Sequence, residues 1–135
     1  MKEAIQTLIT SDKMAHAFEY LKQDEEHTID QQIELVQISS FSPFEEKRAI
    51  RFKELLTEAG LDPVMDEVHN VYAHIHGTGN GPTLYVSAHL DTVFPPETPL
   101  PVKREGTKIY APGIGDDTRG LAEILTLAKS EAKRS

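Results

Sequence analysis

The segments SAHLDTVFPP (residues 87–96) and YAPGIGDDTRG (residues 110–120) place a histidine and three aspartates beside apolar runs. A hydrophobic core has no use for such groups, because burying an unpaired charge is costly. His89 and Asp91 are two residues apart at the end of the run TLYVSAH (83–89). Two strand residues with this spacing point to the same side, so this histidine and this aspartate can act as a pair.

The run at 83–89 is apolar or small at almost every position, which is typical of a strand in the middle of an α/β sheet. In open sheets of this class, sites form at the ends of the strands. Two further strands are predicted at 63–68 and 71–76, the latter joined to 83–89 by the turn-rich GTGNGP. Two hairpins are also predicted, one turning at His69 and Asn70 and one over 101–112 turning at Glu105 and Gly106.

Apolar residues at helical spacing predict a helix over 2–22 and a second over 28–38. A third is predicted after Ser42, which can cap it, with Pro43 in the first turn, Glu45 completing a capping box and Gly60 ending it. A fourth is predicted from the aspartates at 116–117 toward residue 135, with one apolar stripe: Leu121, Ile124, Leu125 and Ala128.

Composition excludes several classes of protein. The chain of 135 residues is of single-domain size, and 22 acidic against 14 basic residues give a formal net charge of −8. This charge repels phosphate backbones and anionic lipids, so neither nucleic acid nor a membrane is an expected partner. There is no cysteine, so any metal must be held by histidine and carboxylate. Without a signal peptide or a membrane-length apolar run, a cytoplasmic location is expected.

Taken alone, HLD favours an ordinary strand-end histidine that hydrogen-bonds an aspartate. GIGDDTRG shifts the balance toward a metal. One aspartate at a helix start is a common cap, but Asp116 and Asp117 repel each other, and a cation would relieve that repulsion. A glycine-rich phosphate cradle ranks lower, because the G-x-G-x-x-G spacing is missing and two carboxylates repel phosphate.

A second histidine pair, His74 and His76, shares a face of the strand predicted at 71–76. No acidic residue lies close by in that segment, so exposed strand-end residues are the better interpretation than a metal site.

The motifs SAHLDTVFP and APGIGDDTRGLA, in which Asp116 follows His89 by 27 positions, resemble the dinuclear-zinc exopeptidase and deacylase family. That family includes acetylornithine deacetylase, succinyl-diaminopimelate desuccinylase, peptidase T and carboxypeptidase G. The resemblance extends back through SSFSPFEEKRA and covers about residues 28–130, leaving 1–27 as a helical lead-in. It implies the N-terminal part of a three-layer catalytic domain, a mixed sheet with flanking helices.

The resemblance implies that His89 and Asp116 are zinc ligands, that Asp91 is the catalytic-site residue orienting His89, and that the 116–117 peptide bond is cis. The complete family site holds two zinc ions, with cobalt or manganese as alternatives. The implied function is hydrolysis of a terminal amide bond in small peptides or N-acyl amino acids. DDTRG, where the family often has lysine, points to a peptidase T-like branch.

The family's glutamate base, its other ligands and its lid or dimerisation domain all lie beyond residue 135 in the family pattern. The chain alone is therefore expected to be truncated and to lack turnover. The alternative is a non-catalytic interaction module that retains the N-terminal half of the fold. The helix after the buried strand would have no parallel neighbour to return to, so an exposed sheet edge would favour a homo-oligomer.

Overall fold

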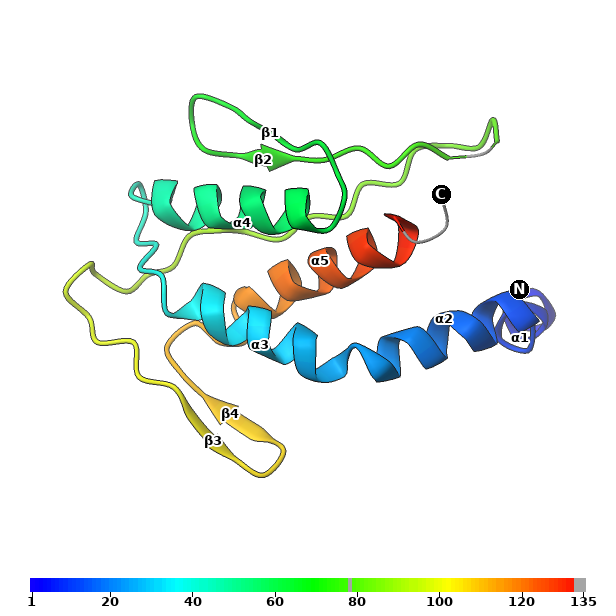
Figure 1. Cartoon of the computed structure of the whole chain (residues 1–135), viewed down its shortest axis with the longest axis horizontal. Coiled ribbons are helices and arrows are strands. Elements are labelled where there is room, and N and C mark those ends of the chain that lie inside the picture. Colours follow the sequence, from blue (N-terminus) through cyan, green and yellow to red (C-terminus); the bar gives the residue numbers. More distant parts are fainter. Residues whose placement is uncertain (78, 133–135) are drawn as a thin grey trace.

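The computed structural model of the chain describes residues 1–77 and 79–132, and within them three helices meet around one apolar core (Figure 1). Helix α5 (Thr118–Ala132) lies between α3 (Glu25–Val36) and α4 (Glu46–Glu58). The apolar stripe predicted for the last helix supplies most of its contribution to this core. The buried apolar cluster consists of Leu35, Phe52, Leu55, Leu56, Leu121, Leu125 and Ala128.

The end of α4 is as predicted, but its start is not. Gly60 has a φ of 93°, and the amides of Gly60 and Leu61 donate to the carbonyls of Thr57 and Leu56, which closes the last turn. The helix begins at Glu46, and its capping position is Glu45, whose side chain makes no capping hydrogen bond. The predicted cap at Ser42 is therefore wrong, because Ser42 and Pro43 form a turn, closed by a hydrogen bond from the Phe44 amide to the Phe41 carbonyl, before the helix starts.

The first predicted helix, 2–22, is divided into α1 (Lys2–Ile9) and α2 (Asp12–Gln23). The break lies at Ser11, whose hydroxyl accepts a hydrogen bond from the amide of Met14 and so caps α2. Serine competes with helix continuation in this way, and the periodicity of apolar residues does not reveal it. The second predicted helix, 28–38, begins and ends earlier, at 25 and 36.

Two short antiparallel hairpins confirm two of the sequence predictions. Strands β1 (Val64–Met65) and β2 (Val71–Tyr72) pair around a turn in which His69 has a φ of 67°. Strands β3 (Lys103–Glu105) and β4 (Lys108–Tyr110) pair around Gly106, with a φ of 61°. Positive φ at a glycine costs nothing sterically, so this turn is local in origin.

The central strand predicted at 83–89 is wrong. The segment forms no strand, and Leu84 and Tyr85 are 84% and 89% exposed. Of the predicted strand 71–76, only residues 71–72 are paired. A buried strand needs hydrogen-bonded neighbours on both edges, and the described residues supply none beside 83–89.

The fold is α/β, with five helices and two small antiparallel sheets within the described residues, in place of the predicted mixed sheet. Residue 78, in the turn predicted at GTGNGP, and residues 133–135, at the predicted end of the last helix, lie outside the description. None of the helices in the described part of the chain is long and apolar enough to cross a membrane.

We expect Leu125→Ala to lower the free energy of unfolding by about 2–5 kcal/mol, because its side chain is completely buried in the α3–α4–α5 core and truncation leaves a cavity. The matched control is Leu127→Ala on the same helix, where the side chain is 46% exposed and the change should stay within about 0.5 kcal/mol. Urea unfolding monitored by circular dichroism measures both. Equal losses for the two variants would contradict the assigned core.

Candidate functional site

The imidazole of His89 lies between two carboxylates, one from Asp91 close by in the chain and one from Asp116, 27 residues after His89. Its Nε2 is 2.8 Å from Oδ1 of Asp116, and its Nδ1 is 3.2 Å from Oδ1 of Asp91 and 3.0 Å from the Asp91 carbonyl oxygen. The structure thus brings together the three residues that the sequence singled out.

The two carboxylates also set the electrostatics of the ring. The hydrogen bond to Asp116, followed by the contacts with Asp91, raises the pKa of His89 above its usual value, although partial burial works in the opposite direction. Protonated imidazole is the form that two carboxylates favour. A cation in place of that proton would satisfy the same negative charge.

The start of α5 holds the acidic side of the site in place. The Asp116–Asp117 peptide bond is cis, as the resemblance implied. The Asp117 carboxylate accepts hydrogen bonds from the amide of Gly120, at 3.1 Å, and from the amide of His89, at 3.3 Å. Asp117 therefore caps the helix and ties the histidine backbone to it, a role that adjacent aspartates in a sequence do not reveal.

The loop before α5 is stabilised by hydrogen bonds from the side chain of Thr118 to the loop backbone. Thr118 is fully buried, and its hydroxyl lies 3.1 Å from the carbonyl oxygens of both Gly113 and Ile114. Gly113 has a φ of 81°, and a Cβ there would come within 3.3 Å of the Thr92 methyl group. Both features explain the glycine: the backbone conformation requires it, and a larger residue would push against the segment that follows His89.

An open hollow of about 300 Å³ adjoins His89 and Asp116. Its other wall is mainly apolar, formed by Val93, Phe94 and Ile114. A mostly apolar pocket with a few polar groups at one end is the usual form of a small-molecule site. All three residues lie within the segments 87–96 and 110–120, but nothing in their residue type marks them as part of a site.

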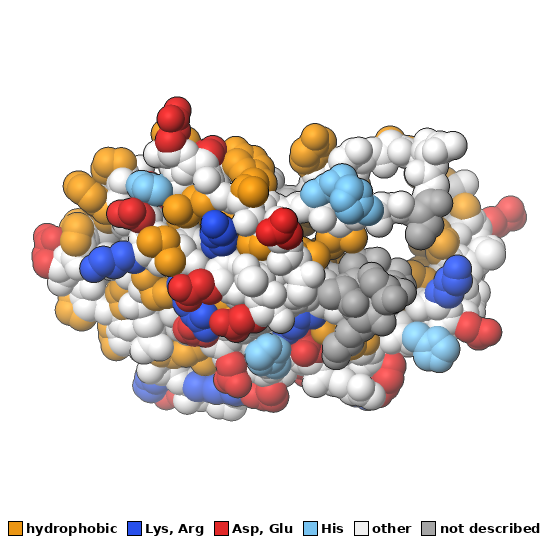
Figure 2. Space-filling view, turned by 45° about the horizontal axis from the view of Figure 1, so that its top comes forward, with side chains coloured by type: hydrophobic (Ala, Val, Ile, Leu, Met, Phe, Trp, Pro, Cys, Tyr) orange, Lys and Arg blue, Asp and Glu red, His pale blue; other side chains and the backbone are white. Residues whose placement is uncertain are grey.

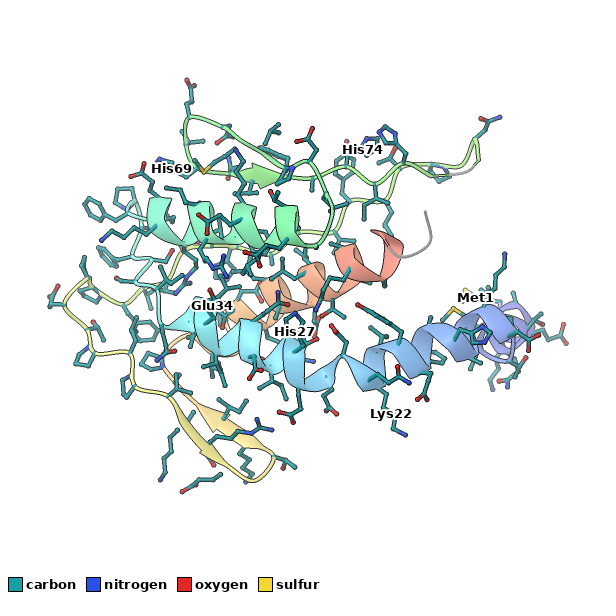
Figure 3. The ribbon with its side chains drawn as sticks, viewed as in Figure 1. Met1, Lys22, His27, Glu34, His69 and His74 are labelled. Carbon is teal, nitrogen blue, oxygen red and sulfur yellow. The ribbon has the colours of Figure 1, made fainter. Side chains whose placement is uncertain are left out.

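The remaining histidines do not join this site. Figure 3 shows three of them in separate places: His27 on α3, His69 in the loop between β1 and β2, and His74 on the irregular segment after β2. The rings of His74 and His76 contact each other edge to face, with centroids 4.3 Å apart, and both residues are exposed. They are exposed as predicted, but on an irregular segment and not at a strand end.

The residue types at the site suit zinc, which binds imidazole nitrogen and carboxylate oxygen. The number of ligands is smaller than zinc requires. Among residues 1–77 and 79–132, no group of three or more histidine, aspartate and glutamate side chains is arranged to hold a metal ion. His89 and Asp116 are therefore one side of a metal site at most, and a protein zinc site normally uses at least three ligands.

No family model matches the chain. It is 44% identical over 64 residues to a candidate LysW-lysine/LysW-ornithine hydrolase of Pyrobaculum aerophilum, an alignment that covers 47% of this chain and 17% of that protein. It is also 28% identical over 120 residues to the uncharacterized protein YqjE of Bacillus subtilis, which covers 78% of this chain and 32% of YqjE. The chain thus spans a third or less of the length of these relatives.

We expect Gly120→Ala to disturb the site through Asp117. A Cβ at position 120 would lie 2.5 Å from the Asp117 carboxylate, which must move and lose its hydrogen bonds to the amides of Gly120 and His89. Loss of a helix cap costs about 1 kcal/mol of unfolding free energy. The amide resonance of His89 should shift in a ¹H–¹⁵N spectrum. In urea unfolding, the loss of the cap is offset by about 1 kcal/mol, because alanine is a better helix former than glycine.

Asp117→Ala serves as the partner in a double-mutant cycle, since it removes the same hydrogen bonds directly. The double variant should be little less stable than either single variant. Fully additive losses would show that Gly120→Ala acts elsewhere.

Proposed function

We propose that this chain contributes one side of the active site of a zinc-dependent hydrolase, which cleaves a terminal amide bond in small peptides or N-acyl amino acids. The observation that carries the proposal is the His89 ring, with one nitrogen against Asp116 and the other against Asp91. The partial similarity to a candidate LysW-lysine/LysW-ornithine hydrolase supports a hydrolase of this kind.

In the proposed site, His89 Nε2 and the Asp116 carboxylate are the two ligands that the chain offers to zinc. Asp91 lies at Nδ1, where it favours the tautomer with the proton on Nδ1 and leaves the Nε2 lone pair for a cation. Cobalt or manganese would be accepted by the same donor types. The remaining ligands and the general base would come from outside the described residues.

Zinc, when bound, polarises an amide carbonyl and lowers the pKa of a bound water. The chain's own contribution is to place the ligands and to shape the pocket. Val93, Phe94 and Ile114 form an apolar wall beside His89, which suits an uncharged part of a substrate. In a peptidase T-like enzyme that part would belong to a small peptide.

We expect His89→Ala and Asp116→Asn each to weaken Zn²⁺ binding at least about 10-fold, because each removes or neutralises one of two ligands. Isothermal titration of the metal-free chain with Zn²⁺ measures the affinity. His16→Ala, on α2, is the matched control for loss of a histidine and should leave the affinity of the site unchanged. Wild-type affinity in both site variants would contradict the proposal.

A second candidate function, a non-catalytic interaction module, is favoured by one observation. Residues 84–86 present Leu84, Tyr85 and Val86 to solvent on a segment without strand partners within the described residues. Figure 2 shows hydrophobic side chains exposed at several places on one face of the molecule, among polar and charged ones. An unpaired extended segment of this kind can add to the edge of a sheet in another chain, including a second copy.

We expect the wild-type chain to self-associate and Tyr85→Lys to reduce that self-association, because a charge in the unpaired segment opposes edge-to-edge pairing. Light scattering coupled to gel filtration measures the mass. Ile50→Lys, which adds the same charge at an exposed apolar position on α4, should leave the oligomer intact. A stable wild-type monomer would contradict self-association through this segment.

A further inference from the structure

Arg48 is a charged residue in the interior of the protein, where arginine is rare unless it is paired. It lies on α4 with 1% of its surface exposed, on the same face as Phe52 and Leu55 of the apolar core. At this position in the sequence, helical spacing predicts an apolar side chain. A charge there calls for an explanation beyond stability.

The guanidinium group of Arg48 joins two loops. Its Nε and Nη2 donate to the carbonyl oxygen of Ile38, at 3.1 and 2.7 Å, just after α3. Its Nη1 donates to the carbonyl oxygen of Leu90, at 2.9 Å. Leu90 is the residue between His89 and Asp91, so the contact falls on the backbone that carries the predicted site.

The same two loops are joined by further hydrogen bonds. The Ser40 hydroxyl donates to the Leu90 carbonyl at 2.7 Å, and the Thr92 amide donates to the Ser40 carbonyl at 2.7 Å. Phe41 and Thr92 form a parallel bridge beside them. The Leu90 carbonyl thus has two donors, which satisfy both lone pairs and fix the orientation of its peptide group.

Burial and charge make this contact specific to arginine. Burial lowers the pKa of Arg48 to about 10, while the Asp91 charge acts to raise it. The group therefore remains a cation at neutral pH. The guanidinium bonds both carbonyls through three separate nitrogens that diverge in a fixed plane, whereas a lysine ammonium would have to place all its donors from one nitrogen.

We propose that Arg48 is a positioning residue: by holding the Leu90 carbonyl against the 38–40 loop, it sets the backbone between His89 and Asp91 and so directs the His89 ring toward Asp116. The importance of that geometry for metal binding rests on the proposed function. The geometry itself does not, because the hydrogen bonds from Arg48 and Ser40 hold the Leu90 carbonyl whatever the neighbouring side chains bind.

The test compares Arg48→Lys with Arg51→Lys, the same substitution one turn away on α4, where the side chain pairs with Glu34 and Glu58 on the outer face. For each variant three quantities are measured in the 135-residue chain: the free energy of unfolding, the amide hydrogen exchange of Thr92 together with the His89 ring resonances, and the affinity for Zn²⁺.

With Arg48→Lys we expect the exchange rate at Thr92 to increase over wild type by more than the rates in the core of α5. The His89 ring resonances should shift, and the affinity for Zn²⁺ should fall by about 10- to 100-fold. With Arg51→Lys the Thr92 exchange rate, the His89 ring resonances and the affinity for Zn²⁺ should match wild type. If wild type itself binds no Zn²⁺, the proposed function fails, and the exchange and resonance data still test the positioning role.

The proposal is overturned if Arg48→Lys lowers stability and accelerates exchange uniformly while the His89 resonances stay as in wild type. That outcome would make Arg48 a structural residue only. Should Arg48→Lys fail to fold, Ser40→Ala removes the second donor to the same carbonyl. It should shift the His89 resonances in the same direction by a smaller amount, and an unchanged His89 would overturn the proposal.

Discussion

The packing of α5 between α3 and α4 is the constraint on which the rest of the structure depends. The helix buries Leu121, Leu125 and Ala128 in the core, and its first residues follow directly from Asp116 and Asp117. The same element therefore supplies apolar burial and the acidic side of the site. Because the core fixes the axis and rotation of α5, it also fixes where the two carboxylates meet His89.

Polar contacts beside this core determine how α5 is aligned along α3. The hydroxyls of Thr28 on α3 and Thr126 on α5 lie 2.6 Å apart in a buried position, and Lys129 pairs with Asp24 nearby. A buried hydrogen bond is costly to leave unmade, so it specifies register more strongly than it adds net stability. A shift of α5 along its axis would break the threonine pair and would also draw Asp116 away from His89.

What the sequence predicts well here is local in origin. The end of α4 at Gly60 and the turn at Gly106 are specified by residues within a few positions, and the structure has both. Ser42 is a preferred capping residue, but it lies three positions before the capping position of α4 at Glu45, so the start of α4 was predicted too early. Capping signals identify residue types, and tertiary contacts then select among them.

The juxtaposition of His89, Asp91 and Asp116 was the part of the site that motif spacing could indicate. Arg48 was missed, although it carries a recognisable signal: a charged residue at a position where the helical period of α4 requires an apolar one. The contributions of Asp117 and Ser40 depend on hydrogen bonds to backbone atoms of distant segments. Such bonds involve groups that every residue has, so no side-chain pattern encodes them.

The incorrect strand at 83–89 bears on the metal ligand proposed at His89. The apolar pattern of TLYVSAH describes a strand with neighbours on both edges, and none of the described strands lies beside it. The segment leads directly into His89. A strand paired with 83–88 would lie about 4.8 Å away, and its end would fall beside the imidazole. Any polypeptide that completed the sheet would thus also be placed to offer a further ligand next to His89, so that sheet pairing and metal binding would be coupled.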